Sequence, residues 1–413
     1  MSASRLSTQC CIAGGGPAGM MLGLLLARAG INVIVLEKHA DFFRDFRGDT
    51  IHPSTLDLID QLGLREQFDA VPLSSLKTLD MVINGLRLTP LNFGLLRGND
   101  RLVIMPQWDF LSMLSAAAHQ LPTFTLLMNA EAVELVRDGE RATGVVAETA
   151  DGRVEITADL TVAADGRDST LRDDSGLRLI EFGVPVDVLW FRLPRPSANP
   201  PDTLAYITPT TMFITIPRTD YYQTARLIPK GGFDAIRAAG LDEFREALSA
   251  SVPFLRPSAA AIASWNDVKL LTVQVNRLEQ WSFPGFLCIG DAAHAMSPAF
   301  GVGINYAIQD AVAAANLLVG PLRRGSLSAT DLERVQSRRA GPAKRMQDIQ
   351  LRLHSVVGRP GGGRLLPSPV PAATRRLLRV VIPPARFFTA RLIGRGFRPE
   401  RIRPAVLSPR EPA

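Results

Sequence analysis

Three glycines near the start of the chain have the spacing of a nucleotide-binding turn. Gly14, Gly16 and Gly19 fit the G-x-G-x-x-G pattern, and Glu37 follows about twenty residues later. Gly14 permits a tight turn, Gly16 leaves the backbone open to a pyrophosphate, and Gly19 lets a helix approach a strand. A carboxylate such as that of Glu37 can bind ribose hydroxyl groups. These residue types in this order indicate a dinucleotide-binding site.

The surrounding sequence predicts the elements that would position these residues. Apolar residues over 9–13 and 31–36 predict two buried strands, and 20–29 is rich in Met, Leu and Ala, which favour a helix. Such a helix presents free N–H groups and its positive dipole end to the phosphates. A purely structural glycine turn is the alternative, and the complete strand–turn–helix–strand unit ending in an acid argues against it.

Two acidic turns occur much later in the chain. The first follows a predicted strand at 159–164 and reads Asp-Gly-Arg-Asp-Ser over 165–169. The second spans 290–305, begins Gly-Asp-Ala-Ala-His, and separates a predicted strand at 286–289 from an apolar helix over 303–319. Helix capping is the structural alternative for the aspartate of each turn, because Asp is favoured at that position.

Together, and in this order, the three motifs resemble those of the class A flavoprotein monooxygenases of the para-hydroxybenzoate hydroxylase type. The resemblance covers about residues 9–320. It implies FAD as cofactor, NADPH or NADH as co-substrate, and O2 and a small aromatic molecule, phenolic or quinone- or polyketide-like, as substrates. It implies hydroxylation of that molecule through a flavin C4a-hydroperoxide. The sequence has no second G-x-G-x-x-G, so the nicotinamide cofactor would have no domain of its own, as in that family.

The same resemblance assigns cofactor contacts. The contacts to the adenosine and the pyrophosphate are Gly14, Gly16, Ala18, Gly19, Glu37, Lys38, Val133 and Asp165. Asp165 would also contact NAD(P)H. The other assigned contacts are Arg47, Gln107, Asp291, Pro298, Gly303, Ile304 and Asn305. Arg47 would lie near the flavin, Asp291 would bind the ribityl chain, and Pro298 with the backbone of 303–305 would lie along the isoalloxazine ring. No catalytic residue and no metal site is assigned.

The physical chemistry of the second acidic turn agrees with those roles. Gly301 and Gly303 let the main chain approach a flat ring, and the helix that follows aims N–H groups at the region that becomes negative on flavin reduction. Two histidines lie near these motifs. His52 is a candidate to face the flavin, whereas a local structural role is favoured for His294. Aromatic residues between 182 and 275 are more typical of a core than of a substrate pocket.

Two other function classes stay open. A FAD-dependent reductase of the isoprenoid-saturating type shares the first motif. A non-catalytic binding protein of the same fold, like the GDP-dissociation inhibitors, would have lost flavin-facing residues such as Asp291, Pro298 and Gly303, which this chain retains. A flavin-dependent halogenase would need a Trp-x-Trp-x-Ile-Pro type segment, which this sequence lacks.

Length and pattern predict an α/β protein of several domains. A chain of 413 residues with 46% hydrophobic and 21% charged residues exceeds one compact core. We expect a Rossmann-like FAD-binding domain formed by 1–75, 100–181 and 276–330. An antiparallel-sheet substrate domain formed by 76–99 and 182–275 would be intertwined with it. A basic helical C-terminal region would follow over 331–413.

Charge and cysteine content limit the partners and the cellular location that we expect. Residues 331–413 contain 18 Lys and Arg against 5 Asp and Glu, a formal charge of +13, whereas the rest of the chain carries −7. The basic tail therefore does not indicate nucleic acid at the active site. Its predicted helices, broken at Pro383-Pro384 among other points, form either a solvated face or a weak contact with anionic membrane or a partner. The three cysteines lie in apolar runs, and no apolar run reaches about 18 residues, so a cytoplasmic protein is expected.

Overall fold

The main sheet of the computed structural model carries the glycine turn. The structure describes residues 4–43, 50–196, 203–218, 220–357 and 366–408. The sheet has the order β19-β20-β11-β1-β2-β8, with β9 and β10 attached beside β11. Its strands are β1 (Ser4–Ala13), β2 (Val33–Glu37), β8 (Phe124–Met128), β9 (Glu131–Asp138), β10 (Arg141–Thr149), β11 (Gly152–Ala163), β19 (Ser282–Phe283) and β20 (Phe286–Cys288). The parallel pairs β1–β2, β1–β11 and β11–β20 bring the three motifs to one edge of the sheet.

Strand β11 differs from the prediction of a separate strand at 159–164. It is one continuous strand that pairs with β10 in antiparallel fashion and with β1 in parallel fashion. Its first four residues are exposed or half-buried, its next four alternate between buried and exposed, and its last four are all buried. The change of pattern marks the point where the strand enters the core, and it reads in the sequence as a boundary between two strands.

Helices cover the main sheet. Helix α1 (Pro17–Arg28) begins at the glycine turn and packs between α4 (Gln107–Ala118) and α8 (Gly303–Arg323). The stretch Ala299–Arg323 has the length and apolar composition of a membrane span, but 78% of its apolar window is buried, as in the core helix of a soluble protein. Cys10, Cys11 and Cys288 are also buried in this core.

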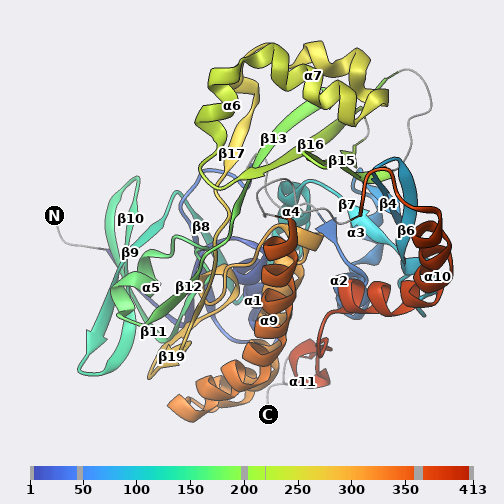
Figure 1. Ribbon diagram of the computed structural model, residues 1–413. Helices are drawn as coiled ribbons and strands as arrows, with labels where there is room; N and C mark the ends of the chain where they lie inside the picture. Colours follow the sequence, from blue (N-terminus) through green and yellow to red (C-terminus); the bar gives the residue numbers. More distant parts are fainter. Residues whose placement is uncertain (1–3, 44–49, 197–202, 219, 358–365, 409–413) are drawn as a thin grey trace.

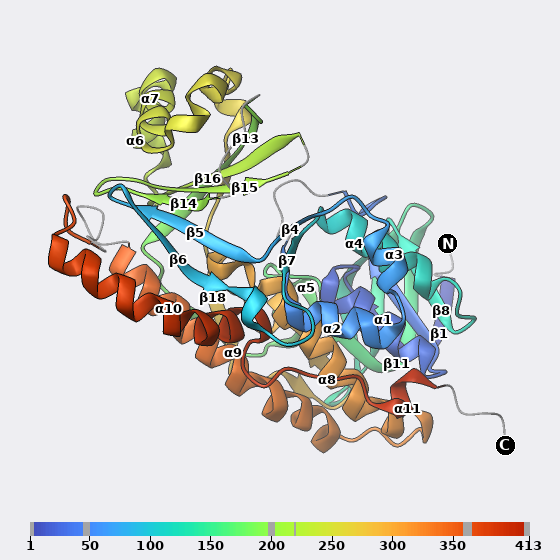
Figure 2. The same cartoon turned by 90° about the vertical axis from the view of Figure 1, so that its right-hand side faces the viewer.

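A second sheet lies beside the first, as Figures 1 and 2 show. Its order is β17-β13-β16-β15-β14-β5-β6. All its pairs are antiparallel except β14–β5. Its elements, including the covering helices, are β5 (Thr78–Ile83), β6 (Leu86–Asn92), η1 (Phe93–Leu95), β13 (Val186–Pro194), β14 (Thr203–Ile207), β15 (Met212–Pro217), β16 (Tyr221–Pro229), α6 (Phe233–Ala239), α7 (Leu241–Ser251), η2 (Pro253–Ala261), η3 (Trp265–Asp267) and β17 (Lys269–Leu271). The α/β fold class is thus confirmed, and the domain boundaries stay a prediction.

Shorter elements connect the two sheets. They are β3 (Thr50–Ile51), α2 (Pro53–Leu62), α3 (Arg65–Asp69), β4 (Ser74–Leu76), β7 (Leu102–Ile104), α5 (Thr170–Ser175), β12 (Leu179–Phe182), β18 (Val275–Leu278), η4 (Gly290–Ala292) and η5 (Ala299–Gly301). Strands β3, β7 and β4 form a small sheet of their own, and β12 pairs with β18. The connections place β3 against the start of α8, which is where the second acidic turn ends.

The C-terminal region is helical, with α9 (Ala329–Val357), α10 (Ala372–Arg395) and α11 (Pro404–Leu407). The predicted break at Pro383-Pro384 is wrong, because α10 continues through both prolines. The carbonyls that lose their N–H partners there belong to Arg379 and Val380, which are exposed, so water can satisfy them. The glycine run 361–363 lies outside the described residues.

Candidate cofactor site

Of the three glycines that form the motif, only Gly16 has free space beside it. Gly14 has a φ of +106°, and a Cβ on it would fall on the carbonyl of Ala164. A Cβ on Gly19 would fall on the Gly14 carbonyl, so this residue allows α1 to approach the turn. A Cβ on Gly16 would meet no atom within 4 Å. Gly16 therefore faces open space where a pyrophosphate can approach the backbone.

The predicted adenosine contacts lie at the ends of β2 and β9. Glu37 is 9% exposed, and its carboxylate accepts hydrogen bonds from the N–H groups of Gly15 and His39, each at 3.1 Å. Lys38 instead points to solvent, with Nζ 3.6 Å from the Glu131 carboxylate. Val133 is half-buried on β9. The sheet therefore brings Glu37 against the glycine turn, while Lys38 lies on the surface beside it.

Asp165 lies next to the glycine turn because the Ala164 N–H donates to the Ala13 carbonyl at 2.8 Å. Its Oδ2 accepts a hydrogen bond from the Leu171 N–H at 3.4 Å, and its buried Oδ1 has no partner among the described residues. Burial raises the pKa of this carboxyl above its ordinary value. An orphaned buried carboxylate oxygen beside an open glycine backbone fits a ligand that brings its own hydrogen-bond donors, as the hydroxyl groups of a dinucleotide do.

The two acidic turns meet through an ion pair. Asp291 lies in η4, 30% exposed by its side chain, and its Oδ2 is 3.3 Å from Nη2 of Arg167. The Nε of Arg167 is buried and has no hydrogen-bond partner among the described residues. Arg167 was not predicted as a site residue, although it lies inside the first acidic turn. This guanidinium is a further group that can meet an anionic cofactor.

The loop before α8 is fixed by residues from β3 and α2. The Gly301 carbonyl accepts from Oγ1 of Thr50 at 2.7 Å and lies 3.0 Å from Nε2 of His52. The Asn305 side chain accepts from the His52 N–H at 2.9 Å and from Oγ1 of Thr55 at 2.8 Å, and it donates to the Thr50 carbonyl. The Asn305 side chain is therefore used within the protein, which leaves its backbone for the predicted ring contact.

Helix α9 holds the other side of the same loop. The Gln350 amide donates to the carbonyls of Ser297 and Ala299 at 3.0 and 2.9 Å, and Oγ of Ser297 lies 2.6 Å from Nε2 of His354. These contacts bracket Pro298. These contacts were not predicted from the sequence, in which the only available signal is the spacing of Gln347, Gln350 and His354 on one face of a helix.

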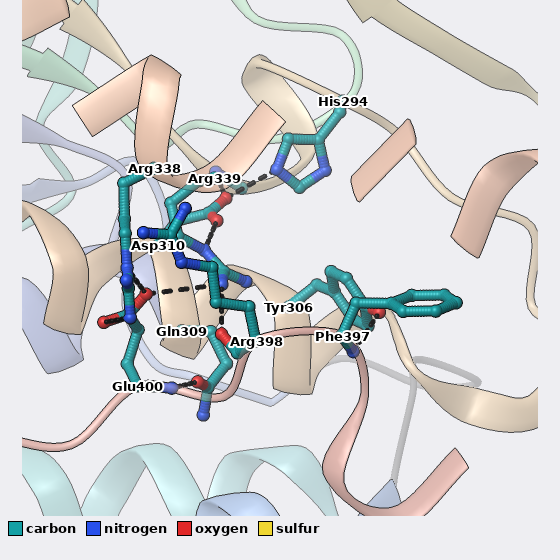
Figure 3. A network of polar contacts seen from close by, with 10 residues as sticks. His294, Tyr306, Gln309, Asp310, Arg338, Arg339, Phe397, Arg398 and Glu400 are labelled. Carbon is teal, nitrogen blue, oxygen red and sulfur yellow. Dashed lines mark hydrogen bonds and ion pairs between the residues drawn. The ribbon is translucent and has the colours of Figure 1, made fainter. Parts of the chain in front are cut away.

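A buried charge network lies behind the second acidic turn (Figure 3). Nε2 of His294 is 2.5 Å from Oδ2 of Asp310, and Nε of Arg339 is 2.9 Å from Oδ1 of the same carboxylate. Glu400 extends the network through Arg338, at 2.6 Å, and through Arg339. Burial opposes ionisation of Asp310, but His294 and Arg339 together hold its pKa below the ordinary value. The side chain of His294 is therefore buried and pairs with Asp310 of α8.

A cavity of about 270 Å³ opens between the small sheet and the second sheet. Pro106 lines it and directly precedes Gln107, the half-buried first residue of α4. Among its other lining residues are Trp108, Asp109, Arg192, Arg218, Asp220 and Tyr221. Of the aromatic residues between 182 and 275, Tyr221 is in this lining, whereas Phe191, Phe213 and Tyr222 are buried in the core. Arg47 lies outside the described residues.

His52 predicts an acid-sensitive fold. Both ring nitrogens face carbonyls, those of Ile393 and Gly301, yet burial outweighs these contacts and lowers the His52 pKa from 6.5 to about 4. The unfolded chain therefore binds a proton that the folded chain does not, and stability falls as pH drops from 6.5 towards 4. Between about pH 7 and about pH 4.5 we expect this residue to remove about 2–3 kcal/mol from the free energy of unfolding.

Urea denaturation at a series of pH values tests this expectation. His52→Gln removes the titrating group, so its stability should fall less on acidification than that of the wild type. A His119→Gln variant, at a partly exposed histidine, provides the matched comparison. Equal acid sensitivity of wild type and His52→Gln would refute the assignment to His52.

The proteins that this chain resembles agree with the cofactor that the site geometry indicates. Residues 7–349 match the family described as "FAD binding domain". A 6-methylpretetramide 4-monooxygenase from Streptomyces rimosus is 33% identical over 425 residues, covering 98% of this chain and 96% of the relative. The fold resembles the anhydrotetracycline hydroxylase OxyS from Streptomyces rimosus, with a TM-score of 0.72, 21% identity and coverage of 94% and 76%. It also resembles PqsL, a probable FAD-dependent monooxygenase from Pseudomonas aeruginosa, with a TM-score of 0.75, 20% identity and coverage of 85% and 97%.

The family match covers most of the chain, and the first-named relative is aligned over nearly its whole length. The orphaned Asp165 oxygen and the open Gly16 backbone fit the cofactor that this family name specifies. The chain therefore belongs to the FAD-binding domain family, as a FAD-dependent monooxygenase of the aromatic hydroxylase type.

Proposed function

We propose that this chain hydroxylates a phenolic substrate of the aromatic polyketide class, using NADPH or NADH and O2. The observation that carries the proposal is the 33% identity to a 6-methylpretetramide 4-monooxygenase over 98% of the chain. One oxygen atom enters the aromatic ring, and the other leaves as water with the two electrons that NAD(P)H supplies. The relatives named above are oxygenases, so they give no support to the reductase or to the non-catalytic binding protein.

The proposed cofactor contacts are those of the two acidic turns and the glycine turn. Gly14, Gly16, Ala18, Gly19, Glu37, Val133 and Asp165 would hold the adenosine and pyrophosphate, with Lys38 beside them. Asp291, Gln107, Pro298 and the backbone of Gly303, Ile304 and Asn305 would hold the flavin end, with Arg47. FAD, when bound, would carry electrons from NAD(P)H to O2. The protein contributes binding, orientation and exclusion of water.

The cavity beside α4 is the proposed substrate site. It borders Pro106, next to Gln107, so a substrate there would lie near the proposed flavin contacts. Its lining residues include Arg192 and Arg218 as well as Asp109 and Asp220, and the guanidinium of Arg192 lies 5.2 Å from the centre of the Tyr221 ring. The aromatic side chains of the lining favour a flat ring, and Arg192 would pair with an ionised oxygen on it, such as that of a phenolate. Ionisation also makes the ring electron-rich, which oxygen transfer to it requires.

Arg192→Gln tests the substrate site. We expect the KM for a phenolic substrate to rise by about tenfold, because a charge-assisted hydrogen bond is lost. The KM for NAD(P)H should stay unchanged. Arg178→Gln, at an exposed arginine outside the cavity lining, is the control and should leave both values unchanged. An unchanged phenol KM in Arg192→Gln would move the substrate away from this cavity.

The function itself is tested with purified protein and a panel of phenols, quinones and aromatic polyketides. The protein should be yellow, and one substrate class should stimulate both NAD(P)H oxidation and O2 uptake, with labelled oxygen from O2 appearing in the product. Stimulated NAD(P)H oxidation without O2 uptake would indicate a reductase. Colourless protein that takes up no added FAD would indicate a binding protein. A cytoplasmic location stays a prediction.

A further inference from the structure

Helix α10 is fixed to the protein along one face of its C-terminal half. Nε of Arg386 donates to the Thr89 carbonyl at 2.7 Å, and Oγ1 of Thr389 donates to the Pro90 carbonyl at 2.6 Å, so the helix is tied to β6. Ala390 is fully buried, and a Cβ on Gly394 would approach the Phe93 ring. Figure 2 shows α10 running along the outside of the molecule beside β6. The orientation of the helix, and therefore of its opposite face, is fixed.

That opposite face is apolar although it is exposed. We define the outer face of α10 as Leu377, Val380, Val381, Phe387 and Phe388. Their exposures are 62%, 73%, 50%, 40% and 70%. Intervals of three, four and seven residues align them in one stripe. They are five of the eleven large hydrophobic residues that are exposed among the described residues, so the exposed apolar surface is concentrated on this helix.

The charge of α10 is of one sign. The helix contains six arginines and no aspartate or glutamate. Arg375, Arg376, Arg379 and Arg391 are exposed, and none of them pairs with a carboxylate of the described residues. Helical spacing places Arg376 and Arg391 beside the apolar stripe. Apolar side chains next to arginines are the composition of a helix that lies in the boundary between lipid headgroups and acyl chains.

We propose that the outer face of α10 binds the surface of a bilayer that contains anionic lipid. The apolar stripe would enter the headgroup–acyl boundary, and the arginines would contact lipid phosphates. A second copy of the chain is the less suitable occupant. An isologous contact of α10 with itself would bring guanidinium groups of the same sign together, with no acidic residue on the helix to pair with them. The proposal does not depend on which aromatic substrate the enzyme takes.

Vesicle sedimentation with the full-length, FAD-loaded protein tests the proposal. Wild type should sediment with phosphatidylcholine vesicles that contain roughly one-quarter phosphatidylglycerol and stay in solution with phosphatidylcholine alone. Leu377→Ser/Phe388→Ser should lower the partition coefficient by at least about tenfold, through lost apolar burial. Arg376→Gln/Arg391→Gln should lower it by about 25-fold, because each of the two charges near an anionic surface contributes about fivefold.

Control variants change exposed residues elsewhere on the protein. Leu270→Ser, at a 45% exposed leucine of β17, and Arg153→Gln, at an exposed arginine of β11, should sediment like wild type. The proposal is overturned if wild type stays in solution with both vesicle types, or if Leu377→Ser/Phe388→Ser sediments like wild type. It is also overturned if light scattering finds a dimer that this double variant dissociates. Flavin absorbance and NAD(P)H oxidation, measured on every variant, report separately on the proposed function.

Discussion

Gly16→Val is expected to fold like the wild-type chain and to bind FAD about 100-fold more weakly. In the protein without cofactor, the space at Gly16 can hold a larger side chain, since a Cβ there meets no atom within 4 Å. Its φ of −74° and ψ of −176° are also allowed for a β-branched residue. The added methyl groups would occupy the space proposed for the pyrophosphate. Circular dichroism should match the wild-type apoprotein, and FAD titration should show the loss.

Two other glycines make this result interpretable. Gly183→Val changes a glycine that also has open space around it but lies far along the chain, before β13, and it should bind FAD like wild type. Gly19→Val places its side chain on the Gly14 carbonyl, so it should fail to fold rather than lose the cofactor alone. Wild-type affinity for FAD in a folded Gly16→Val protein would remove the glycine turn from the cofactor site.

Asp310→Asn is expected to lower the free energy of unfolding by about 3–5 kcal/mol. Asp310 is fully buried between His294 and Arg339, and Arg339 is itself 1% exposed. Removing the carboxylate charge leaves a buried guanidinium whose nearest remaining carboxylate is that of Glu400, at 3.6 Å. The Gly290 N–H also donates to Asp310, at 3.2 Å, so the change loosens the turn that carries Asp291. Urea denaturation of apoprotein measures the effect without the cofactor.

The control for this prediction is an ion pair on the surface. Glu148→Gln breaks a contact with Arg153 at 3.2 Å in which both side chains are more than half exposed, and it should change stability by less than about 0.5 kcal/mol. A loss of under about 1 kcal/mol in Asp310→Asn would mean that the network is not the support of the second acidic turn.

The strongest predictions from sequence concern local patterns that end in a motif. The glycine turn, the two acidic turns and the strands before them have the order and chain direction expected, because each depends on short apolar runs and on residues with few permitted roles. The Asn305 backbone contact with cofactor stays a prediction. The use of its side chain to clamp β3 and α2 needed the three-dimensional contact.

Sequence patterns misled where burial changes within one element. Strand β11 is continuous although its burial pattern changes along its length, and α10 continues through Pro383-Pro384 at a point where Arg379 and Val380 are exposed, so that water can satisfy the freed carbonyls. Both errors have the same origin. The hydrophobic pattern of a segment reflects how deeply its residues are buried, and burial changes from one end to the other in both β11 and α10.

By itself the sequence determined the family, the cofactor chemistry and the α/β class, since glycine conformations, strand periodicity and acidic turns are encoded over a few adjacent residues. Only the tertiary structure decided that Arg167 meets Asp291, that α9 supports the loop around Pro298, and that His294 pairs with Asp310. It also decided which face of α10 stays exposed. These partners are distant in the chain, and a polar side chain gives no local sign of the group that will satisfy it after folding.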